Sequence, residues 1–108
     1  MDPSDVVIVL TTLPAAADPG PFANALVEEH LAACASVSGE VRSTYRWESR
    51  VTENVERQVI IKTTASRIQD LRTRLTSLHP YTAPEFIVLT AAGGSDDYLA
   101  WIRLSVVA

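Results

Sequence analysis

The sequence predicts an α+β fold in which one antiparallel sheet carries helices on one face. Stretches with apolar side chains at helical spacing alternate with short apolar, β-branched runs, and one pair of extended runs is joined by a short turn. The 108 residues match the usual size of one domain, and 47% of them are hydrophobic while 20% are charged. We therefore expect one core and a single domain over residues 1–108.

The first strand and the first helix are expected before residue 34. Residues 6–12 are apolar or β-branched on both alternating sets of positions, which is typical of a central strand. Asp18 followed by Pro19 matches an N-cap with proline at the first helical position. The apolar side chains that then share one helical stripe are Phe22, Ala23, Leu26, Val27 and Leu31. This pattern predicts an amphipathic helix that ends near Ala33.

A long hairpin is expected next. Residues 34–47 read as an extended segment interrupted by a bend or bulge at Ser38 and Gly39. After a turn at 48–49, residues 51–63 return as the third strand. The hairpin has more strand than one sheet of a domain this size can pair, and unpaired strand edges invite another chain. The surplus strand therefore predicts self-association.

A second amphipathic helix should follow the hairpin. Ser66 with Gln69 fits a capping box, and Pro80 ends the helix. The apolar side chains that recur at helical spacing in it are Ile68, Leu71, Leu75 and Leu78.

A fourth strand and a short helix complete the chain. Residues 86–91 are apolar enough for a central strand, and Ser95 is expected to cap the last helix. The elements run βαββαβ with an extended hairpin between the second and third strands and a short C-terminal helix, which is the ferredoxin-like sandwich. Right-handed crossovers place the first and third strands in the middle. The sheet face opposite the first two helices is left without a helix, and a second copy of the chain is the simplest cover for it.

Charge and composition argue against several classes of partner. The net charge of -4 disfavours a nucleic-acid binder, because phosphate neutralisation needs a clustered excess of Lys and Arg. The apolar run at 6–10 is too short to cross a bilayer, and Asp2 and Asp5 replace the basic flank of a signal peptide. The lone Cys34 cannot form an internal disulfide, unlike the cysteines of small secreted domains. We expect a cytoplasmic protein that contacts neither nucleic acid nor membrane.

The sequence does not predict an enzyme. It contains no GxSxG, P-loop or GxGxxG motif, so no organic cofactor is predicted. An enzyme that used Cys34 or Lys62 as nucleophile would need a neighbouring base, and no candidate base adjoins either residue.

Residues 79–85 are the segment densest in functional residue types. Two prolines fix the backbone here, so His79, Tyr81 and Glu85 are held in set directions at the entrance of a strand. Two readings stay open. The segment is either a rigid connection with His79 at a helix C-terminus, where a cation is favoured, or a loop that positions binding groups.

The predicted hairpin carries a second group of candidates. Tyr45 and Trp47 share one strand face, and exposed aromatic side chains on a projecting hairpin more often form an interface than a ligand platform. Lys62, in an otherwise apolar strand, could attract an anion or pair with a carboxylate such as Glu85. Cys34 is more often a small buried residue than a metal ligand.

Several motifs occur in order over nearly the whole chain. They are Thr11-Thr12 with Pro14, Leu31-Ala32-Ala33-Cys34, Tyr45-Arg46-Trp47-Glu48, Ile61-Lys62-Thr63-Thr64, His79-Pro80-Tyr81 with Pro84-Glu85, and Asp97-Tyr98-Leu99-Ala100-Trp101. Together they resemble the CutA divalent-cation-tolerance family. The resemblance implies a ferredoxin-like subunit in a homotrimer, with hairpins that wrap neighbouring subunits, clefts at the interfaces, and a role in tolerance to copper and other divalent metals.

The resemblance also implies which positions line the cleft, namely Cys34, Trp47, Lys62, His79, Tyr81, Glu85 and Trp101. His79 is the implied metal ligand, for Cu(II) or another divalent cation. Family members with a copper site have Cys where this chain has Thr11 and a further His where it has Leu78, so one chain offers few ligands. The alternative is a PII-like sensor without a dedicated metal site, which would bind a small anion through Lys62 or an unidentified protein partner.

Overall fold

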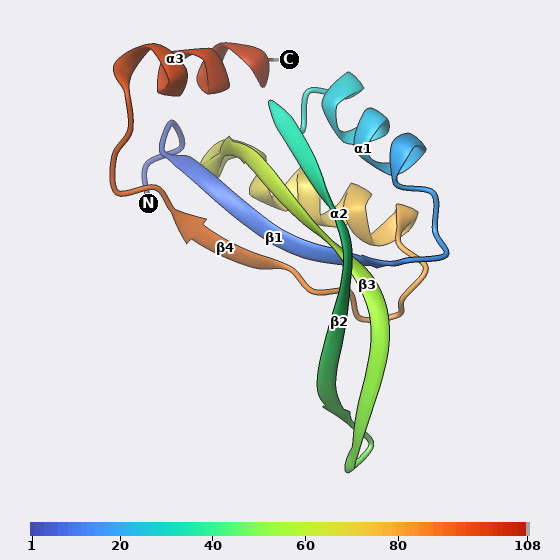
Figure 1. Cartoon of the computed structure of the whole chain (residues 1–108). Coiled ribbons are helices and arrows are strands. Elements are labelled where there is room, and N and C mark those ends of the chain that lie inside the picture. Colours follow the sequence, from blue (N-terminus) through green and yellow to red (C-terminus); the bar gives the residue numbers. More distant parts are fainter. Residues whose placement is uncertain (108) are drawn as a thin grey trace.

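Figure 1 shows the path of the chain in the computed structural model, which describes residues 1–107. The strands are β1 (Val6–Pro14), β2 (Cys34–Trp47), β3 (Arg50–Thr64) and β4 (Ile87–Thr90). The helices are α1 (Pro19–Glu28), α2 (Ile68–Leu78) and α3 (Asp96–Ser105), with a single 3-10 turn, η1 (Ala65–Arg67), before α2. The antiparallel sheet has the order β2-β3-β1-β4, which confirms the predicted α+β, ferredoxin-like arrangement with β1 and β3 in the middle. Within residues 1–107, no helix has the length and apolar character needed to span a membrane.

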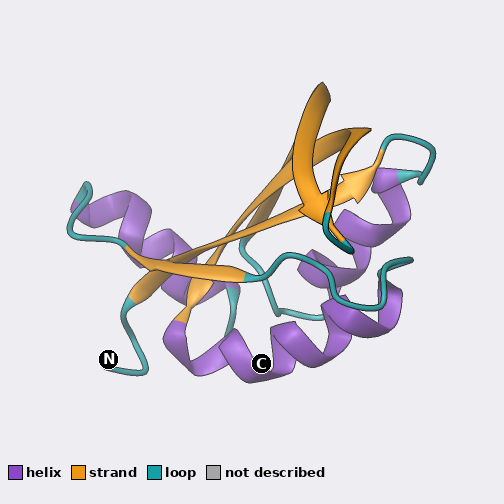
Figure 2. Cartoon of the chain, turned by 90° about the horizontal axis from the view of Figure 1, so that it is seen from below, coloured by secondary structure: helices purple, strands orange, loops and turns teal. Residues whose placement is uncertain are grey.

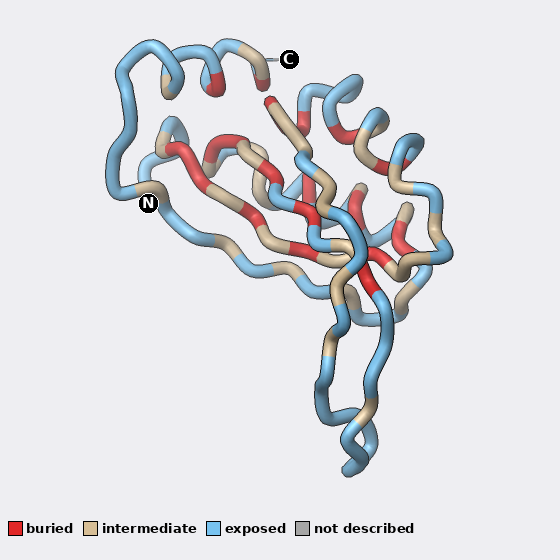
Figure 3. The backbone as a smooth tube through the Cα atoms, in the orientation of Figure 1, coloured by how far each residue is buried: buried red, intermediate tan, exposed pale blue. Residues whose placement is uncertain are grey.

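The core lies between the sheet and the pair α1 and α2, which form a separate layer from the strands in Figure 2. Alternate side chains of β1 and β3 face these helices and are buried, among them Val9 and Ile61. They pack against Leu26 of α1 and against Leu71 and Leu75 of α2, which are also buried. Figure 3 shows that buried residues are concentrated in this layer, whereas the outer hairpin is largely exposed.

Helix α1 begins as predicted but ends earlier than predicted. The Asp18 carboxylate accepts a 3.0 Å hydrogen bond from the Gly20 N–H, which confirms the N-cap. The helix ends at Glu28 because His30 adopts a left-handed backbone with φ 59°. The His30 N–H donates to the Val27 carbonyl, and the Leu31 N–H donates to the Leu26 carbonyl. These two bonds are the pattern of a Schellman motif.

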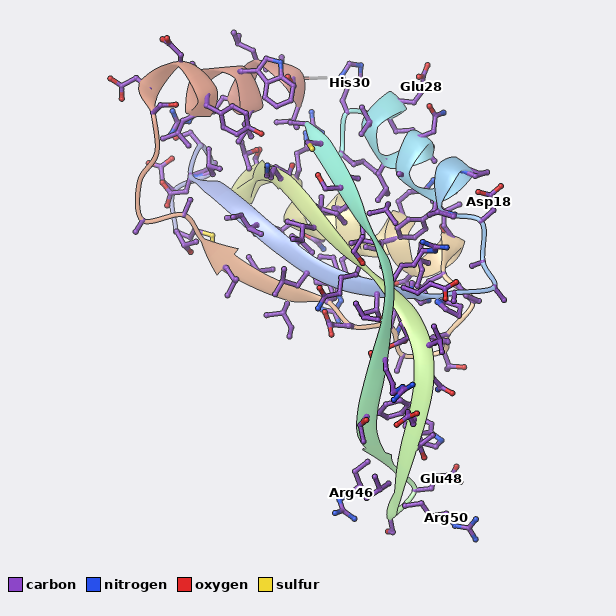
Figure 4. The ribbon with its side chains drawn as sticks, in the orientation of Figure 1. Asp18, Glu28, His30, Arg46, Glu48 and Arg50 are labelled. Atoms are coloured by element: carbon purple, nitrogen blue, oxygen red, sulfur yellow. The ribbon has the colours of Figure 1, made fainter. Side chains whose placement is uncertain are left out.

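This chain reversal changes the environment of two side chains. Val27 is exposed, so the predicted apolar stripe is narrower than its sequence pattern suggested. His30 lies beside the end of α3 in Figure 4, where its Nδ1 donates a 3.3 Å hydrogen bond to the Ser105 carbonyl.

The hairpin of β2 and β3 carries the predicted bulge and turn. The register shifts between Val37 and Glu40, and Trp47 pairs with Arg50 across a two-residue loop. Glu48 and Ser49 have φ of 50° and 66°, as a type I′ turn requires. In Figure 4 the tip with Glu48 stands far from the helices. The outer hairpin therefore makes no contribution to the core of its own chain.

Strand β4 is an edge strand, as the predicted central position of the first and third strands requires, so only the interpretation of its apolar pattern as that of a central strand is wrong. It is apolar because Val88 packs against the core while Ile87 and Leu89 point to the opposite sheet face. We call that opposite side of the sheet, turned away from α1 and α2, the open face. Helix α3 covers one end of it, since Ile102 and Val106 pack against Val6, so the open face is not entirely free of helix.

The two remaining cap predictions also need correction. Ser66 lies in η1, one turn before α2, and its hydroxyl bonds that of Thr64 at 2.9 Å, so no capping box forms. Ser95 occupies the N-cap position of α3, but its side chain makes no cap hydrogen bond.

Candidate functional site

The predicted cleft residues fall into two groups, one beside the middle of β3 and one near its C-terminal end. The Glu56 cluster comprises Thr12, Glu56, His79 and Tyr81, with Glu85 and Trp47 at its rim. The Lys62 cluster comprises Cys34, Lys62, Tyr98 and Trp101. The alternation of side chains along β3 places Glu56 and Lys62 on the same face of the sheet.

A carboxylate that is only 7% exposed lies at the centre of the Glu56 cluster. Oε2 of Glu56 accepts hydrogen bonds from the Tyr81 hydroxyl at 2.9 Å and from the Thr12 hydroxyl at 3.3 Å. Burial, together with the bond to Glu56, raises the pKa of Tyr81 to about 12. Tyr81 therefore stays protonated and remains a hydrogen-bond donor throughout the physiological range.

His79 forms hydrogen bonds through both of its ring nitrogens. Nε2 is 2.5 Å from the Thr12 carbonyl, and Nδ1 is 3.0 Å from the Tyr81 backbone N–H. Because a carbonyl only accepts and an N–H only donates, Nε2 carries the proton and Nδ1 is the acceptor. Each nitrogen thus has a partner within its own chain, and a metal ion would have to displace one of them.

The Glu56 cluster lines a cavity of about 600 Å³ between the loop that follows α2 and the base of the hairpin. Thr12, Glu56 and Tyr81 form the inner wall, and Trp47 and Glu85 reach it from the hairpin and from the approach to β4. Trp47 and Glu85 are exposed. The cavity therefore combines hydroxyl and carboxylate oxygens from Thr12, Glu56 and Tyr81 with the aromatic surface of Trp47. This combination suits a small polar ligand or a partner side chain.

In the Lys62 cluster, the Lys62 ammonium group is hydrogen-bonded to the hydroxyl of Tyr98. Its Nζ donates a 3.1 Å hydrogen bond to the Tyr98 hydroxyl and lies 5.3 Å from the centre of that ring. The bond to Tyr98 raises the pKa of Lys62, against a smaller opposing effect of burial. Lys62 thus does not pair with Glu85, as the sequence had suggested it could.

Two further residues complete the Lys62 cluster. Trp101 packs on Tyr98 with ring centres 5.4 Å apart, and Cys34 is the cross-strand neighbour of Lys62. Cys34 is half-buried, with its sulfur 3.5 Å from the Ser36 hydroxyl.

The two clusters cannot meet within one chain. Glu56 and Lys62 are six residues apart on β3, which corresponds to about 20 Å at roughly 3.3 Å per residue. Within residues 1–107, no three His, Cys, Asp or Glu side chains converge as a metal site would require. The structure thus brings Tyr81, Glu85 and Trp47 together at one cavity. His79 is not in the cavity wall but is hydrogen-bonded to two residues that are, Thr12 and Tyr81. Cys34, Lys62 and Trp101 lie apart from it, in the Lys62 cluster.

Glu56 was not singled out from the sequence, although it is the most buried carboxylate of the site. Strand alternation predicts that it shares a face with Lys62, but on a hairpin strand that pattern is typical of an exposed side chain. In the fold it is hydrogen-bonded by Tyr81, which lies 25 residues later, and by Thr12 on the neighbouring strand, and neither contact can be read from the local pattern. Tyr98, the partner of Lys62, was likewise recognised only as part of a motif.

Comparisons with known proteins agree with these motifs. The family model described as CutA1 divalent ion tolerance protein matches residues 7–105. The divalent-cation tolerance protein CutA of Pectobacterium atrosepticum is 41% identical over 102 residues, covering 94% of this chain and 93% of its own. That of Thermus thermophilus is 42% identical over 96 residues, covering 89% and 93%.

Solved structures of similar proteins have the same fold. The divalent cation tolerance protein of Thermus thermophilus superposes with a TM-score of 0.89 at 40% identity, covering 93% of this chain and 97% of its own. CutA from Xylella fastidiosa gives 0.90 at 36% identity, with coverage of 94% and 98%. The similar structure from Archaeoglobus fulgidus, with a TM-score of 0.88 at 26% identity and coverage of 94% and 98%, is described as a periplasmic divalent cation tolerance protein.

Proposed function

This chain belongs to the CutA1 divalent ion tolerance protein family, and on that premise we propose that it confers tolerance to divalent cations, Cu(II) among them, as a homotrimer. The proposed trimer binds metal weakly in the clefts between its subunits and is not an enzyme. The proposed unit is a single CutA-like domain over residues 1–108, because the family match spans residues 7–105.

The apolar surface of the open face carries the proposal of self-association. Leu10 of β1 lies directly between Ile60 of β3 and Ile87 of β4, and Ile8 lies beside Leu89. Ile60, Ile87 and Leu89 are 39%, 49% and 47% exposed. A contiguous apolar surface across three neighbouring strands is typical of a protein interface. We propose that a second copy of the chain covers this surface. The projecting hairpin supplies the unpaired strand and the aromatic side chains that would contact that copy.

The geometry of the two clusters supports a site shared between subunits. Because the clusters lie about 20 Å apart in one chain at 3.3 Å per strand residue, a neighbouring subunit is needed to bring Lys62 or Cys34 near His79 and Glu85. Metal binding at His79 must also displace the Tyr81 N–H or the Thr12 carbonyl. That competition supports weak binding rather than a tight, dedicated site.

Two measurements test the proposal. Light scattering should give about three times the 11.7 kDa chain mass, and a mass of one chain would contradict it. In a copper(II) titration, the wild type should bind copper more tightly than His79→Asn does. The matched control is His30→Asn, at an exposed left-handed position that Asn tolerates. Equal copper binding by wild type and His79→Asn would remove His79 from the site.

A second candidate function is a PII-like sensor of a small anion. Its support is Lys62, a cationic side chain on the open face whose Nζ is held in place by a 3.1 Å hydrogen bond to the Tyr98 hydroxyl. Nucleotides and small carboxylates would then raise the melting temperature of the wild type, and Lys62→Met would lose the effect. The absence of any such rise, combined with copper binding, would favour the metal-tolerance function alone.

The compartment is a separate part of the proposal. A single half-buried cysteine supports a cytoplasmic location, whereas the relative from Archaeoglobus fulgidus is named as periplasmic. Cell fractionation with one marker enzyme for each compartment tests this directly. Recovery of the protein with the periplasmic marker would contradict a cytoplasmic location.

A further inference from the structure

A second cavity, of about 370 Å³, lies away from the candidate site, where the N-terminal segment meets η1 and the end of α3. Its lining includes Ser4, Thr64, Ser66, Arg67 and Arg103. The N-terminal segment is fastened to η1 here, since the Ser66 N–H donates a 2.9 Å hydrogen bond to the Pro3 carbonyl. The walls of this cavity therefore come from three segments that are held together by hydrogen bonds.

Both arginines are anchored through Nε. Arg67 donates from Nε to the Val106 carbonyl at 2.9 Å, and Arg103 donates from Nε to the Ser4 carbonyl at 2.9 Å. These bonds fix the position of each guanidinium group and leave its two Nη groups as further donors. Because the anchoring is done by neutral carbonyls, both positive charges stay uncompensated by these contacts.

Three of the other arginines are paired with carboxylates, and the three that are not, Arg46, Arg50 and Arg72, lie outside this cavity and are exposed. Arg42, Arg57 and Arg74 form ion pairs with Glu53, Glu40 and Glu29, respectively. Among residues 1–107, neither Arg67 nor Arg103 has such a partner. Two fixed arginines without ion pairs at one cavity are thus a distinct feature of a chain with a net charge of -4.

The acidic residues of the N-terminal segment, Asp2 and Asp5, form hydrogen bonds within the turn at residues 2–5. Oδ1 of Asp2 accepts from the Ser4 N–H at 3.0 Å and from its hydroxyl at 2.9 Å, and Oδ2 of Asp5 accepts from the Asp2 N–H at 3.1 Å. The bonds from Ser4, with a smaller contribution from Arg103, lower the pKa of Asp2. Neither aspartate lines the cavity, so among residues 1–107 its wall carries two arginines and no carboxylate.

We propose that this cavity binds a small phosphate-bearing anion, with Arg67 and Arg103 as its ligands. A phosphate group carries close to two negative charges and three acceptor oxygens, which matches two guanidinium groups. The hydroxyls of Thr64 and Ser66 are hydrogen-bonded to each other at 2.9 Å, and the one that accepts in this bond keeps its own O–H as a further donor at the same wall. A carboxylate carries one charge and two oxygens, and a single guanidinium suffices for it. This inference is independent of the metal-tolerance function, because it uses none of the residues of the two clusters.

Inorganic phosphate is the probe for the first experiment. Titrated into the full chain, it should shift the backbone amide resonances of Ser66 and Arg67, whereas sodium chloride at equal ionic strength should not. Acetate should bind more weakly than phosphate. Equal shifts with chloride would reduce the effect to ionic screening, and equal affinity for acetate would reject the phosphate assignment.

Substitutions then test the two arginines. Arg103→Gln should weaken phosphate binding roughly tenfold, as expected for the loss of one charge-assisted hydrogen-bonding group. The control Arg72→Gln, at an exposed arginine of α2 outside the cavity, should bind phosphate like the wild type. Unchanged phosphate affinity in Arg103→Gln would overturn the proposal.

A conservative variant guards against a structural effect. Arg103 also holds the Ser4 carbonyl, so Arg103→Gln could loosen the N-terminal segment. Arg103→Lys keeps the positive charge but loses the planar fork, and it should bind phosphate with intermediate affinity. Wild-type affinity in both Arg103→Lys and Arg67→Lys would show that the guanidinium groups do not hold the anion, and Lys62→Met should leave phosphate binding here unchanged.

Discussion

The Tyr81 hydroxyl donates a 2.9 Å hydrogen bond to Oε2 of Glu56, a carboxylate that is only 7% exposed. This bond fastens the loop between α2 and β4 to the base of the hairpin in β3. It joins the two chain segments that line the 600 Å³ cavity, so the shape of the candidate site depends on it.

Tyr81→Phe should lower the free energy of unfolding by about 2 kcal/mol, the usual range for a hydrogen bond to a charged group. The Glu56 carboxylate would keep only the longer bond from Thr12. Chemical denaturation measures the change. Tyr45→Phe is the control for loss of an exposed hydrogen bond, since the Tyr45 hydroxyl accepts one from Asn54 on the hairpin, and it should cost no more than about 1 kcal/mol. A double-mutant cycle with Glu56→Gln should give a coupling of about 1 kcal/mol or more, and additive effects would show that the bond contributes nothing.

The pH dependence of stability should report the same tyrosine. Its pKa of about 12 in the folded protein lies above the ordinary value of 10.0, so folding favours the protonated hydroxyl. The resulting stability is fully present below pH 10 and is lost as the pH rises towards 12. Tyrosinate absorbance of the wild type minus that of Tyr81→Phe isolates this group. A titration midpoint near 10 would contradict the buried, hydrogen-bonded environment.

Leu89→Glu should break up the proposed trimer, because it places a charge on the apolar open face beside Ile8. Light scattering is expected to show the mass falling towards that of one 11.7 kDa chain. Leu104→Glu introduces the same charge at a leucine of α3 that is 76% exposed and lies outside the open face. The control should keep the wild-type mass. If Leu89→Glu also kept it, the open face would not be the subunit interface.

Ser49→Gly should stabilise the protein by about 1 kcal/mol. Ser49 has φ 66° in the hairpin turn, where a side chain costs conformational energy and glycine does not. The control Ser43→Gly places glycine within β2, where it should instead destabilise by roughly 0.5–1 kcal/mol. Thermal unfolding of both variants checks the opposite signs. A loss of stability in Ser49→Gly would mean that the serine side chain makes compensating contacts.

Much of the fold follows from patterns within short stretches of sequence. The Asp18 cap, the apolar spacing of α2 and the turn at 48–49 were all predicted, because each depends on neighbours only a few residues apart. The family resemblance likewise rested on motifs that can be read directly from the chain.

The early end of α1 was not predicted, and the apolar pattern of β4 suggested a central strand although the crossover rule places it at an edge. The end of α1 depends on the backbone of His30, and an apolar pattern cannot show which strand lies at an edge. Both features depend on how complete elements pack together. A local pattern can therefore identify a helix or a strand correctly and still misplace its end or its position in the sheet.

The order of the elements, the surplus hairpin and the residue types of the site can all be read from the sequence. The pairing of Tyr81 with Glu56 and of Lys62 with Tyr98, residues that are 25 and 36 positions apart, becomes visible only in the folded chain. Local periodicity records which face a side chain takes, because that follows from backbone geometry. Which distant side chain it meets there depends on sheet register and on loop packing, and these are set by the free energy of the whole fold.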